Sequence, residues 1–183
     1  MADKRKIAFQ GVPGAYSHMA CNTHAPKHIP LPCESFSEMI AAVQNGDAEL
    51  AMVPVENSTA GRVADIHHLL PESGLYIIGE HYQPVHHKLL GLKGVRPEQI
   101  TEVHSHEQGL AQCRKSLRAH GIKPVIHTDT AGAAKDIAAR GEPHIGAVAS
   151  ALAAEINKEI DELFKDLNSD AIKFQELYYL ERQ

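Results

Sequence analysis

Cysteine is scarce in this sequence, and its spacing excludes two common kinds of structural site. The chain of 183 residues has only Cys21, Cys33 and Cys113, an odd number with no CxxC pair among them. No signal-like apolar segment precedes the first of them, and no run of about 20 apolar residues occurs along the chain. We therefore expect reduced thiols in a cytoplasmic protein, with no disulfide framework and no segment that spans a membrane.

Positive charge is also sparse and scattered. The net charge is -5 at pH 7 and no long basic run occurs, so a nucleic-acid surface is not indicated. The 13 histidines include the pairs His67-His68 and His86-His87, but no HExxH motif or cysteine partner accompanies them, and we predict no metal site. With 43% hydrophobic residues, the chain can bury a core as one domain or two small lobes. A small molecule is the expected partner.

The stretch Ala51–Leu70 places polar side chains directly after an apolar run. Residues 48–55 are apolar enough to form a buried strand of a parallel sheet, and Glu56-Asn57-Ser58-Thr59 follows at once, before a helix expected over 61–70. Open α/β sheets bind their ligands at the carboxyl ends of such strands. The same residue types are also common helix caps, so a ligand site and a plain cap both stay open from the residues alone.

The rest of the chain repeats a strand-then-helix rhythm. We expect strands over 6–9, 31–36, 75–80, 85–92, 102–105, 124–127, 145–148 and 171–180. Helices are expected over 17–22, after an N-cap at Ser37, over 107–120 with Ser105 as N-cap, after a cap at Asp129 and Thr130, and over 150–167. In the last helix an apolar stripe from Ile156 to Leu167 indicates core packing or a dimer face, so a homodimer stays open.

This rhythm predicts an α/β fold of two lobes that face each other across a ligand cleft. Polar segments at residues 11–17, 56–59, 105–112 and 129–131 would lie at strand ends that can face the cleft. Helix N-termini meet there, and their free backbone N–H groups suit a small carboxylate or dicarboxylate better than a cation.

Segments in the same order resemble the motifs of the prephenate dehydratase family. They are Phe9-Gln-Gly-Val-Pro-Gly-Ala-Tyr-Ser17, Pro54-Val-Glu-Asn-Ser-Thr-Ala-Gly-Arg-Val63, Ser105-His-Glu-Gln-Gly-Leu-Ala-Gln-Cys113 and Asp129-Thr-Ala-Gly-Ala-Ala134. The resemblance is to the catalytic domain, without the regulatory ACT domain. It implies the type 2 periplasmic binding protein fold, with a first lobe of residues 1–80 and 168–183, a second lobe of residues 81–167, and no cofactor.

The resemblance also implies an activity and a set of site residues. The activity is that of a carbon-oxygen lyase of L-phenylalanine biosynthesis, which converts prephenate into phenylpyruvate by decarboxylating dehydration. The implied catalytic residues are Asn57, Ser105, Gln112 and Thr130, and the implied substrate-binding residues are Glu56, Ser58, Gln108, Lys173 and Phe174. The alternative is a non-catalytic binding module of the same fold for an aromatic or dicarboxylate ligand.

The tail departs from the family's final motif, Asn-x-Thr-Arg-Phe. The corresponding stretch is Asp170-Ala-Ile-Lys-Phe174, so Ile172 stands in place of a threonine and Lys173 in place of an arginine. Isoleucine donates no hydrogen bond, and lysine keeps the positive charge without the two-pronged geometry that suits a carboxylate. The lyase and the binding module therefore differ chiefly at Ile172.

Overall fold

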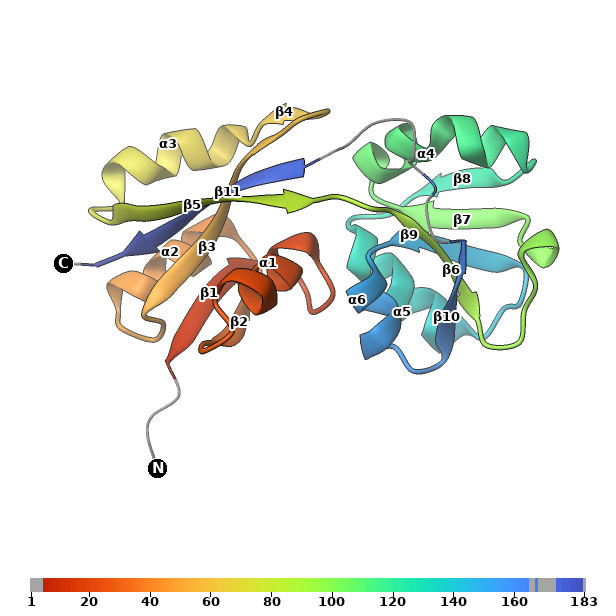
Figure 1. Cartoon of the computed structure of the whole chain (residues 1–183), viewed down its shortest axis with the longest axis horizontal. Coiled ribbons are helices and arrows are strands. Elements are labelled where there is room, and N and C mark those ends of the chain that lie inside the picture. The colour runs from red at the N-terminus through yellow and green to blue at the C-terminus, as the bar shows by residue number, and fades with distance from the viewer. Residues whose placement is uncertain (1–4, 165–166, 168–173, 183) are drawn as a thin grey trace. The chain divides into compact units, whose positions relative to one another are not determined.

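The computed structural model describes residues 5–164, 167 and 174–182, which form two compact α/β units. Unit 1 contains the described residues of Met1–Val12, Tyr16–Pro84 and Lys173–Gln183, and unit 2 contains those of Pro13–Ala15 and Val85–Ile172. Each unit is built on one mixed β-sheet with helices on both faces (Figure 1). Across the described residues, no helix has the length and apolar character needed to cross a membrane.

The sheet of unit 1 has the strand order β2-β1-β3-β11-β5, with the short β4 paired to β3. Its strands are β1 (Lys6–Gln10), β2 (Ile29–Cys33), β3 (Leu50–Asn57), β4 (Gly61–Arg62), β5 (Tyr76–Pro84) and β11 (Phe174–Glu181). Strand β1 pairs in parallel with β2 and β3, whereas β11 lies antiparallel between β3 and β5. The carboxyl ends of β1 and β3 therefore reach the same edge of this sheet.

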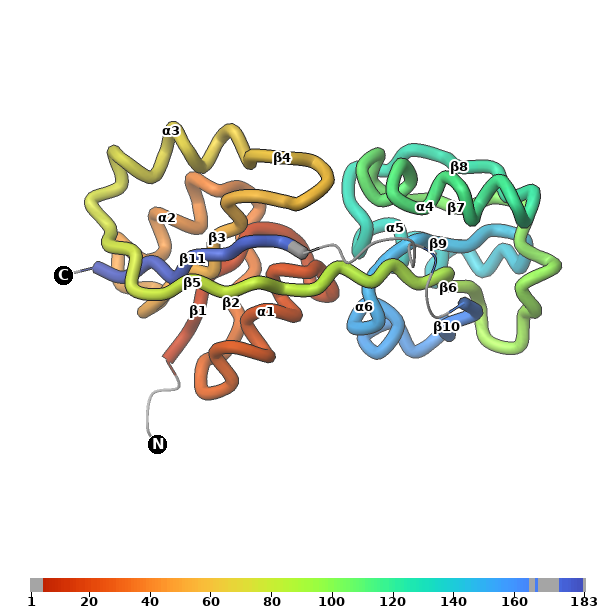
Figure 2. Tube along the Cα trace, turned by 45° about the horizontal axis from the view of Figure 1, so that its top comes forward, coloured from red at the N-terminus to blue at the C-terminus, as the bar shows by residue number. Residues whose placement is uncertain are grey.

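Alternating side chains of these strands build a core on each face of the sheet. The helices are α1 (Tyr16–His24), α2 (Phe36–Gln44) and α3 (Ala64–Glu72). Ile7 and Phe9 pack in the cluster that contains α1 residues, whereas Ala8 packs in the cluster of α2 and α3. Figure 2 shows α1 on one side of these strands and α2 and α3 on the other.

Proline marks the outer strand of this sheet. Pro30 and Pro32 lie in β2, which pairs on one side only, with β1, among the described strands. Because proline has no backbone N–H to donate to a neighbouring strand, it is tolerated at such an edge and discourages pairing with another chain.

Unit 2 has a sheet of order β10-β6-β9-β7-β8. Its strands are β6 (Lys88–Leu92), β7 (Glu102–Ser105), β8 (Lys123–Ile126), β9 (Ile145–Ala149) and β10 (Ile160–Phe164), and its helices are η1 (Pro97–Gln99), α4 (Glu107–Ala119), α5 (Thr130–Arg140) and α6 (Ala151–Ile156). Helix α4 covers one face of the sheet, and α5 and α6 cover the other (Figure 1). Strands β9, β7 and β8 are mutually parallel, so β7 and β8 lead into α4 and α5 at one edge.

The helix expected over 150–167 is wrong beyond Ile156. Ser150 is the N-cap of α6, but the helix ends at Ile156 and residues Ile160–Phe164 form β10, antiparallel to β6. The apolar spacing suits a helix locally, yet β6 offers a free edge, and Gly91 leaves the room that the Leu163 side chain fills. Tertiary pairing therefore overrides the local pattern.

The N-cap of helix α2 lies two residues earlier than expected. Ser35, and not Ser37, is the N-cap: its Oγ accepts a hydrogen bond from the Glu38 backbone N–H at 3.1 Å. The Glu38 carboxylate in turn accepts from the Glu34 N–H at 2.7 Å. A Ser-x-x-Glu pattern that satisfies backbone donors in this way marks a helix start more reliably than a lone serine.

Two imidazoles stack in unit 1 beside the ring of a tyrosine. The rings of His24 and His81 lie 4.3 Å apart between centroids, and Tyr179 meets His81 edge-on at 4.9 Å. The Nε2 atom of His24 and the hydroxyl of Tyr179 are buried with no hydrogen-bond partner among the described residues. Burial, reinforced by repulsion from His81, lowers the pKa of His24, and burial raises the pKa of Tyr179 to about 12.

We predict that replacing His24 by phenylalanine makes the protein less sensitive to acid. The unfolded chain binds a proton at His24 as the pH falls through about 6.5, whereas the folded chain does so only at lower pH, so stability is complete above that value and is lost below it. His24→Phe keeps the stacked ring and removes the titrating group. Urea unfolding at about pH 7.5 and about pH 5.5 measures the difference. The control is His67→Phe, at an exposed position of α3; an equally steep loss in His24→Phe and wild type would contradict the prediction.

Candidate functional site

In unit 1, the polar segment after β3 forms a tight hairpin and not the start of a helix. Glu56 pairs with Arg62 and Asn57 with Gly61, so the chain turns back into β4 before α3 begins at Ala64. Gly61 has φ +79, a conformation that side chains other than glycine's rarely adopt. The expected helix start at residue 61 is therefore wrong.

Asn57 holds this turn together. Its Oδ1 accepts hydrogen bonds from the backbone N–H groups of Thr59 at 3.0 Å and Ala60 at 3.1 Å. Asn57 is thus a turn residue and not a helix cap, since α3 starts after Val63 without a side-chain cap. With Oδ1 engaged by the backbone, the amide NH2 group of Asn57 is held in a fixed direction. Glu56, Ser58 and Thr59 are exposed around it, at the carboxyl end of β3.

In unit 2, Ser105 is buried at the end of β7. It has no exposed surface, and its Oγ donates to the Val148 carbonyl on β9 at 2.5 Å. The N-cap of α4 is His106, whose Nδ1 accepts from the Gln108 N–H at 3.3 Å, so the expected cap at Ser105 is wrong. The hydroxyl of Ser105 ties two neighbouring parallel strands together instead.

Side chains from three parts of unit 2 meet at Gly109, in the first turn of α4. A Cβ atom added to Gly109 would lie 3.0 Å from Ser105 Oγ, 3.4 Å from Thr130 Cγ2 and 3.5 Å from His87 Cε1. The structure therefore brings together two predicted site residues, Ser105 and Thr130. It adds His87, which the sequence offered only as one member of a histidine pair.

The remaining predicted residues of unit 2 line the starts of its helices. Gln108 is exposed in the first turn of α4, and Gln112 is half-buried one turn along from Gly109. Thr130 is the first residue of α5, whose N-cap is Asp129: its Oδ1 accepts from the Gly132 N–H at 2.5 Å. That cap at Asp129 is confirmed.

The centre of the glycine-containing turn after β1, residues Pro13–Ala15, belongs to unit 2. Gly14 has φ +99, and its carbonyl accepts a hydrogen bond of 2.6 Å from the buried Oγ of Ser150 at the start of α6. A Cβ atom on Gly14 would lie 3.0 Å from Ala153 Cα and 3.5 Å from Ala131 Cβ. The turn thus packs against the first turns of α5 and α6, a role for Ser150 that its position as a helix cap did not reveal.

Three predicted tail positions have little structural description. Ile172 and Lys173 lie outside the described residues, and Phe174 is the first residue of β11, with its side chain outside them as well. The pairing of β11 with β3 and β5 places the chain end in unit 1, as the closing strand predicted.

Two of the three cysteines lie in unit 1 and are unsuited to nucleophilic chemistry. Cys21 and Cys33 are buried, and burial raises the pKa of the Cys21 thiol to about 12 and that of Cys33 to about 11. A thiol is nucleophilic only as the thiolate, so these side chains are unreactive near neutral pH. Within residues 5–164, 167 and 174–182, no three His, Cys, Asp or Glu side chains gather as a metal site would require.

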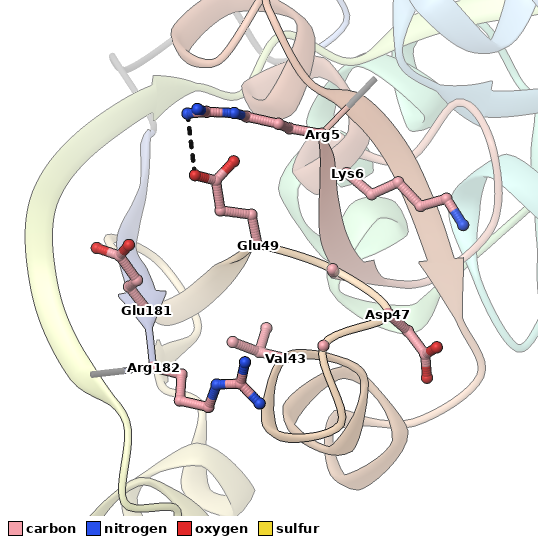
Figure 3. A pocket seen from close by; sticks show the side chains of 9 residues that line it. Arg5, Lys6, Val43, Asp47, Glu49, Glu181 and Arg182 are labelled. Carbon is pink, nitrogen blue, oxygen red and sulfur yellow. Dashed lines mark hydrogen bonds and ion pairs between the residues drawn. The ribbon is translucent and has the colours of Figure 1, made fainter. Parts of the chain in front are cut away.

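A hollow of about 620 Å³ lies at the opposite edge of the unit 1 sheet (Figure 3). It is found at the amino ends of β1 and β3, and Arg5, Glu49 and Arg182 in its lining are engaged with groups of the same unit. Arg5 Nη1 lies 3.1 Å from Glu49 Oε1, and Arg182 Nη1 donates to the Gln44 carbonyl at 3.0 Å. A second hollow of about 490 Å³, lined by Gln10, Ser35 and His68 among others, lies at the carboxyl edge where ligands of such sheets bind.

The two units make a two-lobe α/β protein with polar groups at the carboxyl ends of parallel strands. The chain belongs to the prephenate dehydratase family: the model of that family matches residues 7–173. The match includes the turn at Asn57 and the cluster at Gly109, and it confirms the resemblance drawn from the motifs.

Two relatives have sequences similar to this one over most of the chain. A bifunctional N-acyl-homoserine lactone acylase/prephenate dehydratase of Komagataeibacter europaeus is 52% identical over 157 residues, which are 86% of this chain and 56% of that protein. An arogenate dehydratase/prephenate dehydratase of Arabidopsis thaliana is 38% identical over 180 residues, or 98% of this chain and 46% of that protein. The chain therefore spans about half the length of these relatives.

Solved structures show the same fold. A quorum quenching acylase, GqqA, has a TM-score of 0.91 at 46% identity over 98% of this chain and 64% of that one. The prephenate dehydratase of Arthrobacter aurescens, solved with L-Phe, has a TM-score of 0.89 at 24% identity over 97% of this chain and 60% of that one. Catalytic domains of this family have the two-lobe fold of periplasmic binding proteins, so the expected fold class is confirmed.

We predict that Asn57→Asp separates the turn role of Asn57 from a role in ligand binding. Aspartate keeps an oxygen that accepts from Thr59 and Ala60, so the melting temperature should stay within about 2 °C of wild type, whereas Asn57→Ala loses both hydrogen bonds and should melt several degrees lower. Aspartate also loses the amide donor and adds a negative charge. Phenylpyruvate affinity, measured by calorimetry, should therefore fall at least about tenfold in both variants. Unchanged affinity in Asn57→Asp would leave Asn57 with the turn role alone.

Proposed function

We propose that this chain is a lyase that converts prephenate into phenylpyruvate. The observation that carries the proposal is the family match over residues 7–173. The match includes the turn at Asn57 in unit 1 and the cluster at Gly109 in unit 2. The side chains in those clusters are of the right kind for the reaction, since amides, hydroxyls and helix N-termini are neutral hydrogen-bond donors.

The reaction is an elimination without oxidation or reduction. The bond from the ring to its carboxylate breaks, carbon dioxide leaves, and the electron pair restores the aromatic ring as the ring hydroxide departs. Aromatisation drives the step, so the protein has to hold the carboxylates and to stabilise the departing oxygen. No electron carrier takes part, and the proposal includes no cofactor.

Each cluster supplies donors for these tasks. The Asn57 amide, held by its own turn, offers fixed N–H donors, and the first turn of α5, which begins at Thr130, offers free backbone N–H groups to a carboxylate. A donor aimed at the departing oxygen is worth about 2.7 to 4 kcal/mol of barrier. We assign Asn57, Gln112 and Thr130 to catalysis and Glu56, Ser58 and Gln108 to substrate binding, with Lys173 and Phe174 assigned by the tail motif. We assign Ser105, whose buried hydroxyl donates to the Val148 carbonyl, to positioning the catalytic edge of the unit 2 sheet.

A second candidate activity is the hydrolysis of N-acyl-homoserine lactones at their amide bond. The name of the Komagataeibacter relative includes this acylase activity, and 52% identity over 157 residues makes it relevant to the present chain. Arogenate is a further candidate substrate for the elimination itself, because several Arabidopsis relatives are named arogenate dehydratases.

The test is to incubate the purified chain separately with prephenate, arogenate and an N-acyl-homoserine lactone. We expect release of phenylpyruvate from prephenate at a measurable but low rate, because the tail lacks the family's threonine. The double variant Ile172→Thr/Lys173→Arg should raise kcat toward the ordinary range of about 1 to 1,000 per second and change KM less, since the restored donor acts on the departing oxygen in the transition state.

Other outcomes would replace the proposal. Heat of binding for phenylpyruvate without turnover by either protein would leave a binding module. Release of free homoserine lactone with no phenylpyruvate would favour the acylase. Equal turnover of the wild type and the double variant would mean that the alignment of Asp170–Phe174 with the family motif is wrong.

A further inference from the structure

His87 lies in the short segment that leads from β5 into β6, and its surroundings differ from those of its neighbour. The side chain of His87 is 3% exposed, whereas His86 is exposed. The His87 backbone carbonyl accepts a hydrogen bond from the Leu167 N–H at 3.0 Å. The main chain of His87 is thus held in place, and its imidazole is directed into unit 2.

The imidazole forms one wall of a small space above Gly109. Its Cε1, the Oγ of Ser105 and the Cγ2 methyl of Thr130 all lie within 3.5 Å of the point that a Cβ of residue 109 would occupy. A side chain at 109 would be only 3.0 Å from Ser105 Oγ, which is closer than most such contacts in proteins. Glycine therefore allows the three side chains to close around that point.

The atom that Thr130 contributes to this space is its methyl group and not its hydroxyl. A threonine side chain branches at Cβ, so the methyl and the hydroxyl point in different directions, and χ1 settles in few rotamers. The methyl is the Thr130 atom nearest to the point that a Gly109 Cβ would occupy, and His87 Cε1 borders the same point. Thr130 is half-buried as the first residue of α5, so its side chain is partly accessible there.

We infer that His87 is a positioning residue for the proposed dehydration, which acts by fixing the rotamer of Thr130. The imidazole wall and the absent side chain of Gly109 select the χ1 angle that presents the Thr130 hydroxyl to the substrate. This inference rests on the proposed function for its effect on rate, but the rotamer itself does not depend on that function. His87 needs no contact with the substrate.

The kinetic test is a double-mutant cycle between His87 and Thr130. His87→Ala should lower kcat by about 100-fold, because a donor displaced by roughly 1 Å loses most of its effect, with KM changed about threefold or less. Thr130→Ser keeps a hydroxyl but loses the methyl that the wall holds, so it should cost a similar factor. The double variant should be no slower than the slower single variant. The matched control is His86→Ala, an exposed neighbour, which should change kcat by about twofold or less.

The structural test reads χ1 of Thr130 directly, from three-bond couplings to its methyl carbon by NMR. The wild type and His86→Ala should show a single rotamer, and His87→Ala should show averaging between rotamers. If His87→Ala does not fold, His87→Gln, which keeps a polar side chain without the flat ring, is measured in the same way. These couplings require no substrate.

Each outcome bears on a different claim. Multiplicative losses in the double variant, or an unchanged Thr130 rotamer in the folded His87 variant, would overturn the positioning role. If the wild type converts neither prephenate nor arogenate while His87→Ala still averages the rotamer, the proposed function fails and the structural part of the inference stands. Loss of rate together with rotamer averaging would support both.

Discussion

The pairing of β11 on both of its sides is the interaction on which unit 1 depends. This strand comes from the end of the chain and lies antiparallel between β3 and β5, with Leu177 and Leu180 fully buried on opposite faces of the sheet. Unit 1 is therefore incomplete until the chain has passed through unit 2 and returned. The central pairing of this sheet therefore joins residues far apart in sequence. Closing such a long loop costs conformational entropy before the strand pairs can form, so we expect unit 1 to fold slowly and cooperatively.

The order and direction of the strands also explain where the candidate site residues lie. In each sheet, parallel strands end at one edge, and the residues that follow them can use both side chains and helix N-termini without disturbing the ladder. The two sheets use this edge differently. In unit 1, Asn57 turns the chain sharply and keeps its amide in a fixed direction. In unit 2, Gly109 contributes the absence of a side chain, so that Ser105, Thr130 and His87 can lie close against it.

Sequence reasoning succeeded where local signals agreed with the tertiary structure and failed where long-range pairing decided. The cap at Asp129, a strand that includes Pro32 and the final strand of unit 1 could be predicted, because capping and apolar runs act locally. The hairpin after Asn57 and strand β10 were missed, since each exists through a partner strand that no short window contains. For the site, residue types and order led to Ser105 and Thr130. The place of His87 beside Gly109 could not be predicted, because the pair His86-His87 gives no sign of which ring is buried.

The most direct test is a crystal structure of this chain with phenylpyruvate, the product of the proposed reaction. We expect the product at the carboxyl edge of the sheets, with one of its oxygen atoms within about 3.2 Å of Thr130 Oγ1 and the Thr130 methyl still packed beside Gly109. Product bound only elsewhere, for example in the hollow lined by Arg5 and Arg182, would contradict the assignment of the carboxyl edge as the functional site.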